Sequence, residues 1–251
     1  MALQPIDFYN GKVWKFDQAR PILQREEFAL KLIRKYSKKR TGNFLDVGCG
    51  DGQFLGEASR ALGKNWKYFG VDYSKYRLSQ ARKATGFSYK WCNLEVGIPH
   101  KDGVFDVVYS GEVLEHIYSP DFMIQECGRI LSDNGFLVIT TPNLHAWYNR
   151  LLFLFGVQPI FYETSTVSAK VGAGMMKRLK KQETPVGHIR LFNKRALKDL
   201  LELHGFEVVS MVGADFQALP SAMRKLDRLM GVINPGLTSN LVVIARKGQK
   251  K

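Results

Sequence analysis

The segment FLDVGCGDGQF, residues 44–54, decides the fold of this chain. Four strand-forming residues run into three alternating glycines, Gly48, Gly50 and Gly52, and a helical pattern follows them. Glycine adopts left-handed backbone angles readily and lets a ligand approach the main chain closely. A strand, a glycine turn and a helix in this order predict a ligand-binding corner at one edge of an α/β sheet.

The acidic residues around this turn indicate what kind of ligand it binds. A GxGxxG dinucleotide fingerprint is not completed, because Gln53 stands three residues after Gly50, and no GK[ST] phosphate loop follows. Asp46 and Asp51 would repel a pyrophosphate and favour a ligand with positive charge. Asp72 ends the run YFGVD about 20 residues after the turn, where a carboxylate is placed to bind ribose hydroxyls.

Strand and helix patterns alternate outward from this turn. The expected strands cover residues 44–47, 67–71, 88–92, 105–109, 136–140, 206–210 and 240–245, and the expected helices 21–36, 52–62, 74–84, 120–131, 194–204 and 221–230. The alternation predicts an α/β fold with a doubly wound, mostly parallel sheet. We expect residues 1–41 to form an N-terminal helical extension and residues 42–251 one domain. An acceptor-side insertion is expected at 143–187, where the alternation breaks.

The composition is that of a folded and strongly basic protein. The 251 residues include 37 Lys and Arg against 23 Asp and Glu, which gives a formal net charge of +14. The charge indicates either a partner that carries phosphates or a solvated basic surface. No apolar run of about 18 residues and no signal-peptide core is present, and three widely spaced cysteines build no CxxC site. A cytoplasmic protein, peripheral to the membrane if it binds one, is expected.

Five motifs together carry a resemblance to a known family. The runs FLDVGCGDG, GVDYS, WCNLE, FDVVYSGEVLEHI and GFLVITTPN, in this order, resemble the class I S-adenosylmethionine-dependent methyltransferases. The resemblance is dense over residues 43–142 and looser over 186–246. It implies a methyltransferase with S-adenosylmethionine as cofactor, and a seven-stranded sheet whose last strand is antiparallel.

The resemblance also implies which positions bind the cofactor. At the methionine portion they are Gly48, Gly50 and Gly52, with Asp46 at the amino group and Ser110 and Glu112 near the sulfonium. Asp72 is expected at the ribose. Tyr73 is expected to pack on the adenine, with Asn93 and Leu94 at the adenine edge.

The motif EVLEH, residues 112–116, holds the candidate catalytic residues. If it opens a helix, Glu112, Glu115 and His116 lie at i, i+3 and i+4 on one face, and His188 can approach them from a later loop. Two carboxylates and two imidazoles suit a divalent cation. A motif of the ExxEH type resembles the metal site of the methyltransferases that modify the terminal 2′-hydroxyl of small RNAs. It also resembles the metal site of the quinone O-methyltransferases.

Two versions of the site follow from this motif. In the metal version, Glu112, Glu115, His116 and His188 are the ligands. In the metal-free version, His188 removes a proton from the acceptor, Glu112 serves the cofactor and His116 is the third candidate catalytic residue. We expect the metal-free version.

The insertion bears on the acceptor. Its apolar run Leu151 to Phe155 forms either a buried lid or a membrane-docking surface, and the basic residues Lys177, Arg178, Lys180 and Lys181 follow it. The expected acceptor is a hydroxyl of a small molecule or a lipid-linked glycan, with an anionic membrane surface as a further partner. The alternatives are an RNA 2′-O-methyltransferase, or a catalytically silent protein that binds the cofactor. The oligomeric state stays open.

Overall fold

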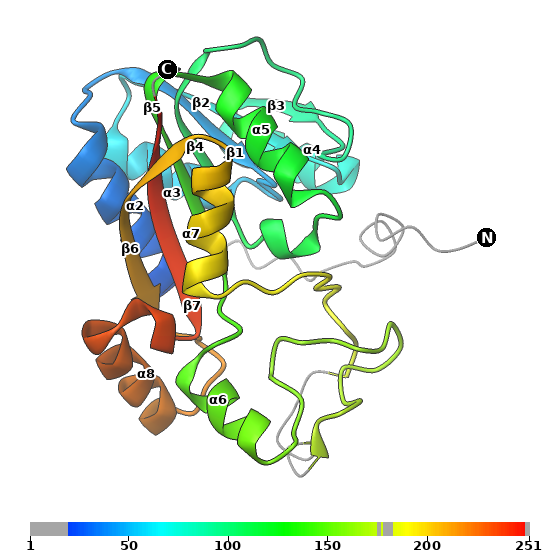
Figure 1. Cartoon of the computed structure of the whole chain (residues 1–251). Coiled ribbons are helices and arrows are strands. Elements are labelled where there is room, and N and C mark those ends of the chain that lie inside the picture. The colour runs from blue at the N-terminus through cyan, green and yellow to red at the C-terminus, as the bar shows by residue number, and fades with distance from the viewer. Residues whose placement is uncertain (1–19, 175–176, 178–182, 249–251) are drawn as a thin grey trace.

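The computed structural model describes residues 20–174, 177 and 183–248. Seven strands form one sheet in the order β3-β2-β1-β4-β5-β7-β6 (Figure 1). Their bounds are β1 Gly42–Val47, β2 Trp66–Asp72, β3 Ser88–Trp91, β4 Phe105–Gly111, β5 Leu131–Pro142, β6 Phe206–Ala214 and β7 Asn240–Lys247. Strands β1 to β5 pair in parallel, whereas β7 runs antiparallel to both β5 and β6. The predicted seven-stranded sheet with an antiparallel last strand is confirmed.

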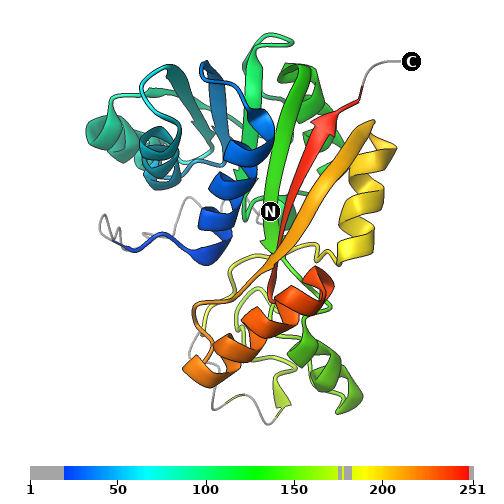
Figure 2. The same ribbon diagram turned by 90° about the vertical axis from the view of Figure 1, so that its left-hand side faces the viewer.

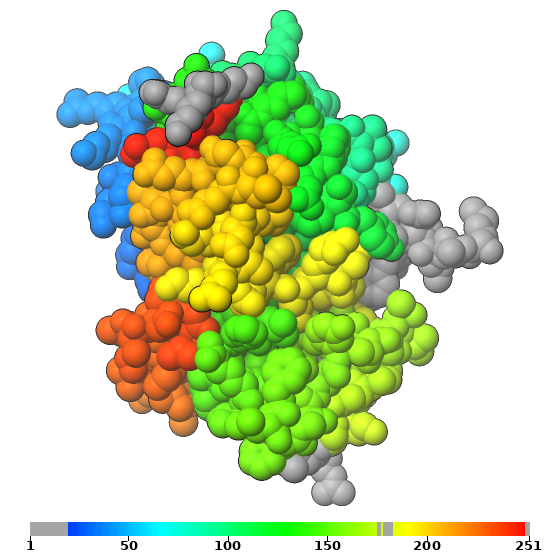
Figure 3. Space-filling view, in the orientation of Figure 1, coloured from blue at the N-terminus to red at the C-terminus, as the bar shows by residue number. Residues whose placement is uncertain are grey.

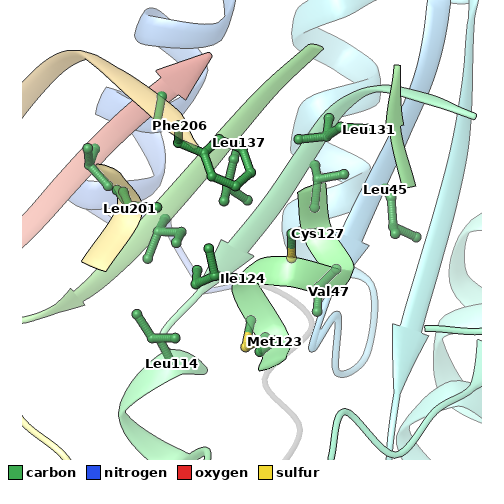
Figure 4. Packing of buried hydrophobic residues seen from close by; sticks show 14 of the residues in the cluster. Leu45, Val47, Leu114, Met123, Ile124, Cys127, Leu131, Leu137, Leu201 and Phe206 are labelled. Carbon is green, nitrogen blue, oxygen red and sulfur yellow. The ribbon is translucent and has the colours of Figure 1, made fainter. Parts of the chain in front are cut away.

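Helices cover both faces of this sheet (Figure 1). Their bounds are α2 Gln24–Ser37, α3 Gln53–Leu62, α4 Lys75–Thr85, α5 Pro120–Ile130, α6 Trp147–Leu154, α7 Lys194–Leu203 and α8 Ser221–Ile233. Alternate strand residues enter opposite cores, because side chains of a strand point to opposite faces in turn. In β1, Leu45 joins the core under α5 and α7, and Phe44 joins the core under α2, α3 and α4. Figure 4 shows the first of these cores, where Met123, Ile124 and Cys127 of α5 pack on the sheet.

Helix α2 is part of the packed molecule. Its apolar residues Ala29, Leu30 and Ile33 are buried on the sheet beside α3. Glu26 closes the first turn, since the N–H of Leu23 donates to its carboxylate at 2.9 Å. The helical part of the predicted N-terminal extension thus contributes directly to the core.

Six of the seven strands are longer than the sequence pattern predicted, and β5 exceeds its predicted range the most. Strand β5 begins at Leu131 rather than at residue 136, although Asp133 and Asn134 are exposed and polar. Leu131 pairs with Phe105, and a register shift then lets Phe136 pair with Val107. Polar residues in such an irregular stretch hide a strand from pattern analysis.

Helix α6, residues 155–174 and helix α8 form a separate projection, which we name the α6–α8 lobe. The two helices lie side by side beyond the end of the sheet where β5 ends (Figures 1 and 2). Tyr148 of α6 packs in one small apolar cluster with Phe161 and with Leu219, which precedes α8. The Tyr148 hydroxyl also donates to Ser239 at 3.0 Å, and Ser239 donates to Asp227 of α8 at 2.6 Å. The space-filling view shows the lobe below the sheet domain (Figure 3).

Among the described residues, no helix combines the length and the apolar character that crossing a membrane requires.

Candidate functional site

The glycine turn after β1 has the backbone that its sequence predicts. Gly48, Gly50 and Gly52 have φ angles of 77°, 52° and 79°, all in the left-handed region. A Cβ atom at Gly48 would lie 2.3 Å from a methyl group of Val113, so a larger residue would have to displace Val113 as well as adopt the left-handed angle.

Asp72, at the end of β2, braces this turn. Its Oδ2 accepts the N–H of Gly50 at 2.8 Å, and its Oδ1 accepts the N–H of Ser74 at 2.7 Å. Burial raises the pKa of Asp72, whereas the two backbone N–H groups and Arg77 lower it. The carboxylate is therefore fixed in direction before any ligand binds, at the place where a ribose is expected.

A polar pocket of about 290 Å³ opens over the turn. It is lined by Arg20, Glu26, Asp46, Gly48, Cys49, Gly50, Asp51, Gln53, Phe54, Arg77, Tyr109 and Gly111. Asp46 lies almost fully buried beneath it, and burial together with the charge of Asp72 raises its pKa well above its ordinary value. A cationic group bound in the pocket would favour the charged form of Asp46. A second hollow, of about 320 Å³ between α2, β6 and α8, shares none of these lining residues.

Several pocket residues had no role in the sequence analysis. Arg20 forms an ion pair with Glu26 at 2.6 Å, and its carbonyl oxygen accepts from the side chain of Gln53 at 2.9 Å. Phe54 stacks on Tyr109 with ring centroids 3.8 Å apart. For this group of pocket residues, the one visible sequence signal was an acidic residue, Glu26, in the first turn of a predicted helix. Its place at the pocket depends on how α2 docks, which the local sequence does not encode.

The residues predicted at the adenine lie beside this pocket rather than in its lining. Tyr73 pairs with Trp91 at 5.5 Å between ring centroids, and Trp91 was not predicted. Asn93 and Leu94 follow β3 and are partly buried. Ser110 is fully buried, between two residues of β4 that line the pocket, so strand alternation turns its side chain to the other face. The roles of these four predicted residues stay predictions.

Glu112 has a strained backbone directly after β4. Its φ angle is 56°, unusual for a residue with a side chain, and its N–H donates to the carbonyl of Thr140. Its carboxylate accepts from the hydroxyl of Thr140 at 2.9 Å and lies 3.6 Å from the guanidinium of Arg25. These contacts hold Glu112 on the sheet edge, between the helix α2 and the strand β5.

The helical face expected for residues 112–116 does not form. Only Leu114–His116 makes a single 3-10 turn, η1, and the next α-helix begins at Pro120. The left-handed angle at Glu112 is incompatible with an α-helix that starts there. Glu112 is consequently separated from the metal-capable group that the other three candidates form.

Glu115, His116 and His188 converge in what we name the Glu–His cluster. One ligand atom from each lies within 4.8 Å of the others, and the two imidazole centroids are 4.9 Å apart. The Nδ1 atoms of His116 and His188 each lie 2.9 Å from a backbone carbonyl oxygen, of Gly187 and Phe161 respectively. Because a carbonyl only accepts, each Nδ1 carries a hydrogen, and in the neutral rings Nε2 is the nitrogen with a lone pair.

Burial sets the protonation of this cluster. Glu115 is fully buried, and its pKa is raised to about 8 by desolvation first and then by the charge of Glu112. Its Oε2 accepts from the hydroxyl of Thr141 at 3.0 Å, whereas Oε1 has no hydrogen-bond partner among the described residues. Burial lowers the pKa of His116. A neutral Glu115 carboxyl beside a neutral His116 imidazole is the expected state near pH 7.

The loop that carries His188 is fixed by Glu163. Its carboxylate accepts the N–H groups of Val186, Gly187 and His188 at 2.8, 2.7 and 3.2 Å. The carbonyl of Glu115 in turn accepts the N–H of Ile189 at 2.8 Å. Glu163 stands in a Ser- and Thr-rich stretch with no motif, so no sequence signal could have found it. The loop and η1 thus form one unit.

The cluster offers two kinds of chemistry. A neutral imidazole can take a proton from a hydroxyl brought next to it. Two imidazole nitrogens and one carboxylate oxygen are also a suitable donor set for a divalent cation. Glu112, the fourth predicted ligand, is committed to Thr140 and Arg25.

Comparisons with known proteins agree with this architecture. A family model described as a methyltransferase domain matches residues 22–211. The ubiquinone biosynthesis O-methyltransferase of Nitrosococcus oceani is 32% identical over 129 residues, which cover 49% of this chain and 53% of that protein. The malonyl-[acyl-carrier protein] O-methyltransferase of Legionella pneumophila is 31% identical over 130 residues, 50% of this chain and 45% of that protein. These matches span about half the length of the relatives.

Solved structures share the fold at low identity. An S-adenosylmethionine-dependent methyltransferase from Aquifex aeolicus has a TM-score of 0.58 and 16% identity, and covers 98% of this chain and 100% of its own. The [4+2]-cyclase SpnF has a TM-score of 0.60 and 17% identity, with coverage of 94% and 87%.

Proposed function

The chain belongs to the class I S-adenosylmethionine-dependent methyltransferase superfamily, and from this we propose that it methylates a hydroxyl group of a small or lipid-linked acceptor. S-adenosylmethionine supplies a methyl group already activated by positive sulfur. The residues of this chain then have to hold the cofactor, orient the acceptor and receive its proton.

The polar pocket and Asp72 fit this cofactor. The anchored carboxylate of Asp72 would accept the ribose hydroxyls, and the buried Asp46 would pair with the positively charged amino group. Arg20 and Arg77 are the cations of the pocket lining and fit the methionine carboxylate. The left-handed glycine turn leaves room for the ligand next to the backbone.

The Glu–His cluster is the observation that favours a hydroxyl acceptor. A hydroxyl must lose its proton as the oxygen–carbon bond forms and the carbon–sulfur bond breaks, so a base is needed at the acceptor. His188 would take that proton on Nε2, while its Nδ1–H stays bonded to Phe161 and keeps the ring in place. Because its pKa is raised to about 8, Glu115 is neutral near pH 7 and adds no negative charge next to the base.

The choice of a small or lipid-linked acceptor has two supports. The relatives are named for ubiquinone biosynthesis, demethylmenaquinone and malonyl-[acyl-carrier protein] methylation. In addition, the run Leu151 to Phe155, which the sequence left open between a buried lid and a docking surface, is exposed in the structure except for Leu152.

Transfer of labelled methyl groups tests the proposal. The protein is incubated with methyl-labelled S-adenosylmethionine and cell extract separated into lipid, small-molecule, RNA and protein fractions. Label in the lipid or small-molecule fraction, lost with His188→Gln, supports the proposal. Label in RNA selects the 2′-O-methyltransferase alternative, and cofactor binding without transfer to any fraction selects the catalytically silent alternative.

A metal-assisted version has one specific observation in its favour. The Oε1 atom of Glu115 is buried next to two imidazoles without a hydrogen-bond partner among the described residues. A divalent ion held there by Glu115, His116 and His188 would lower the pKa of an acceptor hydroxyl. Full activity in the presence of a strong chelator would exclude this version, and loss of activity that added metal restores would select it.

A further inference from the structure

The exposed apolar surface of the molecule is concentrated on the α6–α8 lobe. Eleven of the eighteen exposed large apolar side chains of the described residues belong to it. They are Leu151, Phe153, Leu154, Phe155, Tyr162, Val167, Val171, Leu226, Leu229, Val232 and Ile233. Scattered apolar side chains are ordinary on a surface, but so many of them in one part of the molecule indicate an interaction site.

The two helices expose these residues because their other sides are already occupied. On α8, Leu226, Leu229 and Ile233 recur at helical spacing, whereas Asp227 is fully buried and bonded to Ser239. On α6, Tyr148 and Asn149 are buried, and the last turn exposes Leu154 at 80%. The apolar faces therefore have no partner within the described part of the chain, and rearrangement of the lobe would break its buried polar contacts.

The charges around this surface are positive. Arg150 and Lys225 are exposed in the lobe, whereas the exposed Arg228 forms an ion pair with the buried Asp215 at 2.6 Å. The described acids of the lobe are buried or bound, Asp227 to Ser239 and Glu163 to backbone N–H groups. The segment from residue 143 to 190 contains seven basic and two acidic residues. Lys177 is exposed, whereas Arg178, Lys180 and Lys181 of the same basic run lie outside the described residues.

We propose that the α6–α8 lobe docks the protein on an anionic membrane surface, with the apolar side chains of α6 and α8 in the headgroup region. Apolar groups flanked by Lys and Arg match the interface of a bilayer that contains anionic lipid. A second copy of the chain fits less well, because each copy has a net charge of +14 and the two lobes would bring basic residues together.

Docking would bring the reaction site close to the lipid. Phe161 belongs to the small core of the lobe, and its carbonyl oxygen binds the ring of His188. The lobe and the Glu–His cluster are thus directly connected, and an acceptor embedded in the membrane would meet the cluster without leaving the interface. The inference deepens the proposed function by naming where the acceptor is found.

Co-sedimentation with vesicles tests the docking without any methyl transfer. The full chain is mixed at low salt with vesicles of phosphatidylcholine alone, or of phosphatidylcholine with phosphatidylglycerol. We expect binding to the anionic vesicles, weaker binding at high salt, and a loss of roughly tenfold or more in partitioning when Phe153, Leu154 and Phe155 are all replaced by serine. Arg150→Gln with Lys225→Gln should weaken binding to the anionic vesicles only.

A matched control replaces exposed apolar residues outside the lobe. Val96 and Leu203 are 77% and 73% exposed, so Val96→Ser with Leu203→Ser removes exposed apolar surface away from the lobe and should leave vesicle binding unchanged. Failure of the unaltered protein to bind anionic vesicles, or equal binding by the triple serine variant, overturns the docking proposal. So does a dimer in sedimentation analysis that the triple variant abolishes, since a second copy then covers this surface. Because vesicle binding is read without transfer, its failure would leave the proposed chemistry intact.

Discussion

The proposed cofactor side of the site is built mainly from backbone, whereas the proposed acceptor side is built from side chains that distant segments bring together. On the cofactor side, three left-handed glycines and one anchored carboxylate lie within 25 residues of sequence, from Gly48 to Asp72. On the proposed acceptor side, Glu115 and His188 are distant in sequence, and they meet because both Glu163 and the carbonyl of Glu115 bind the loop that carries His188. Backbone geometry leaves a sequence signature in glycine, and a side-chain assembly leaves almost none.

The largest expected effect separates the two sides by function. His188→Gln removes the proposed base and should lower kcat about 10²- to 10⁴-fold. The affinity for S-adenosylmethionine should change little, because the polar pocket does not include His188. Turnover measured with an identified acceptor, together with calorimetry of cofactor binding, checks both parts. An equal loss in both quantities would show that the two sides are not independent.

The opposite result is expected at the end of β2. Asp72→Ala removes the carboxylate that accepts from Gly50 and Ser74, and with it the predicted ribose ligand. Cofactor affinity should fall about 100-fold, since hydrogen bonds to a charged group each contribute roughly 1.5–3 kcal/mol. Calorimetry measures the loss, and circular dichroism confirms that the variant is folded. Unchanged affinity would place the ribose elsewhere.

The pH dependence of stability tests the buried carboxyl of the acceptor side. The pKa of Glu115 is raised from about 4.5 to about 8, so its contribution to stability is fully present below pH 4.5 and is lost as the pH rises through 8. Glu115→Gln should remove this loss, which amounts to roughly 3–4 kcal/mol between pH 5 and pH 8. Urea unfolding of both proteins at the two pH values measures the difference. If the free energy of unfolding changed equally with pH in the two proteins, Glu115 would be ionised in the folded state.

A smaller effect is expected from the backbone of the glycine turn. Gly48→Ala forces a left-handed angle on alanine, at a cost of about 1–2 kcal/mol, and places its Cβ against Val113. Stability should fall by about that amount, and cofactor affinity should fall with it. Gly86→Ala is the matched control, because Gly86 is also left-handed, with a φ angle of 70°, but has open space around its Cβ position. Only the first variant should lose cofactor affinity.

The fold was predictable because its local signals agree with one another. Ser74 was expected to cap a helix, and its hydroxyl accepts the N–H of Arg77 as a cap does. Helices α3, α4, α5 and α7 begin and end within one or two residues of their expected bounds. The seven strands each lie where alternation of strand and helix placed them.

The candidate site was predictable only in part. The convergence of Glu115, His116 and His188 was expected, but through a helical face that the left-handed Glu112 prevents. No periodicity reports a positive φ angle at a glutamate, because it arises from its contacts with Thr140. The sequence also carried no sign that Arg20 lines the pocket, because its position depends on the long-range packing of α2.

The three hydrogen bonds from the N–H groups of residues 186–188 to the carboxylate of Glu163 have a consequence for protein engineering. A graft that takes the loop around His188 from a relative, but keeps the host residue at position 163, would leave three backbone N–H groups to find new acceptors. An exchange meant to test the proposed acceptor side should therefore take residues 163–188 as one piece, with the recombination breakpoints outside it.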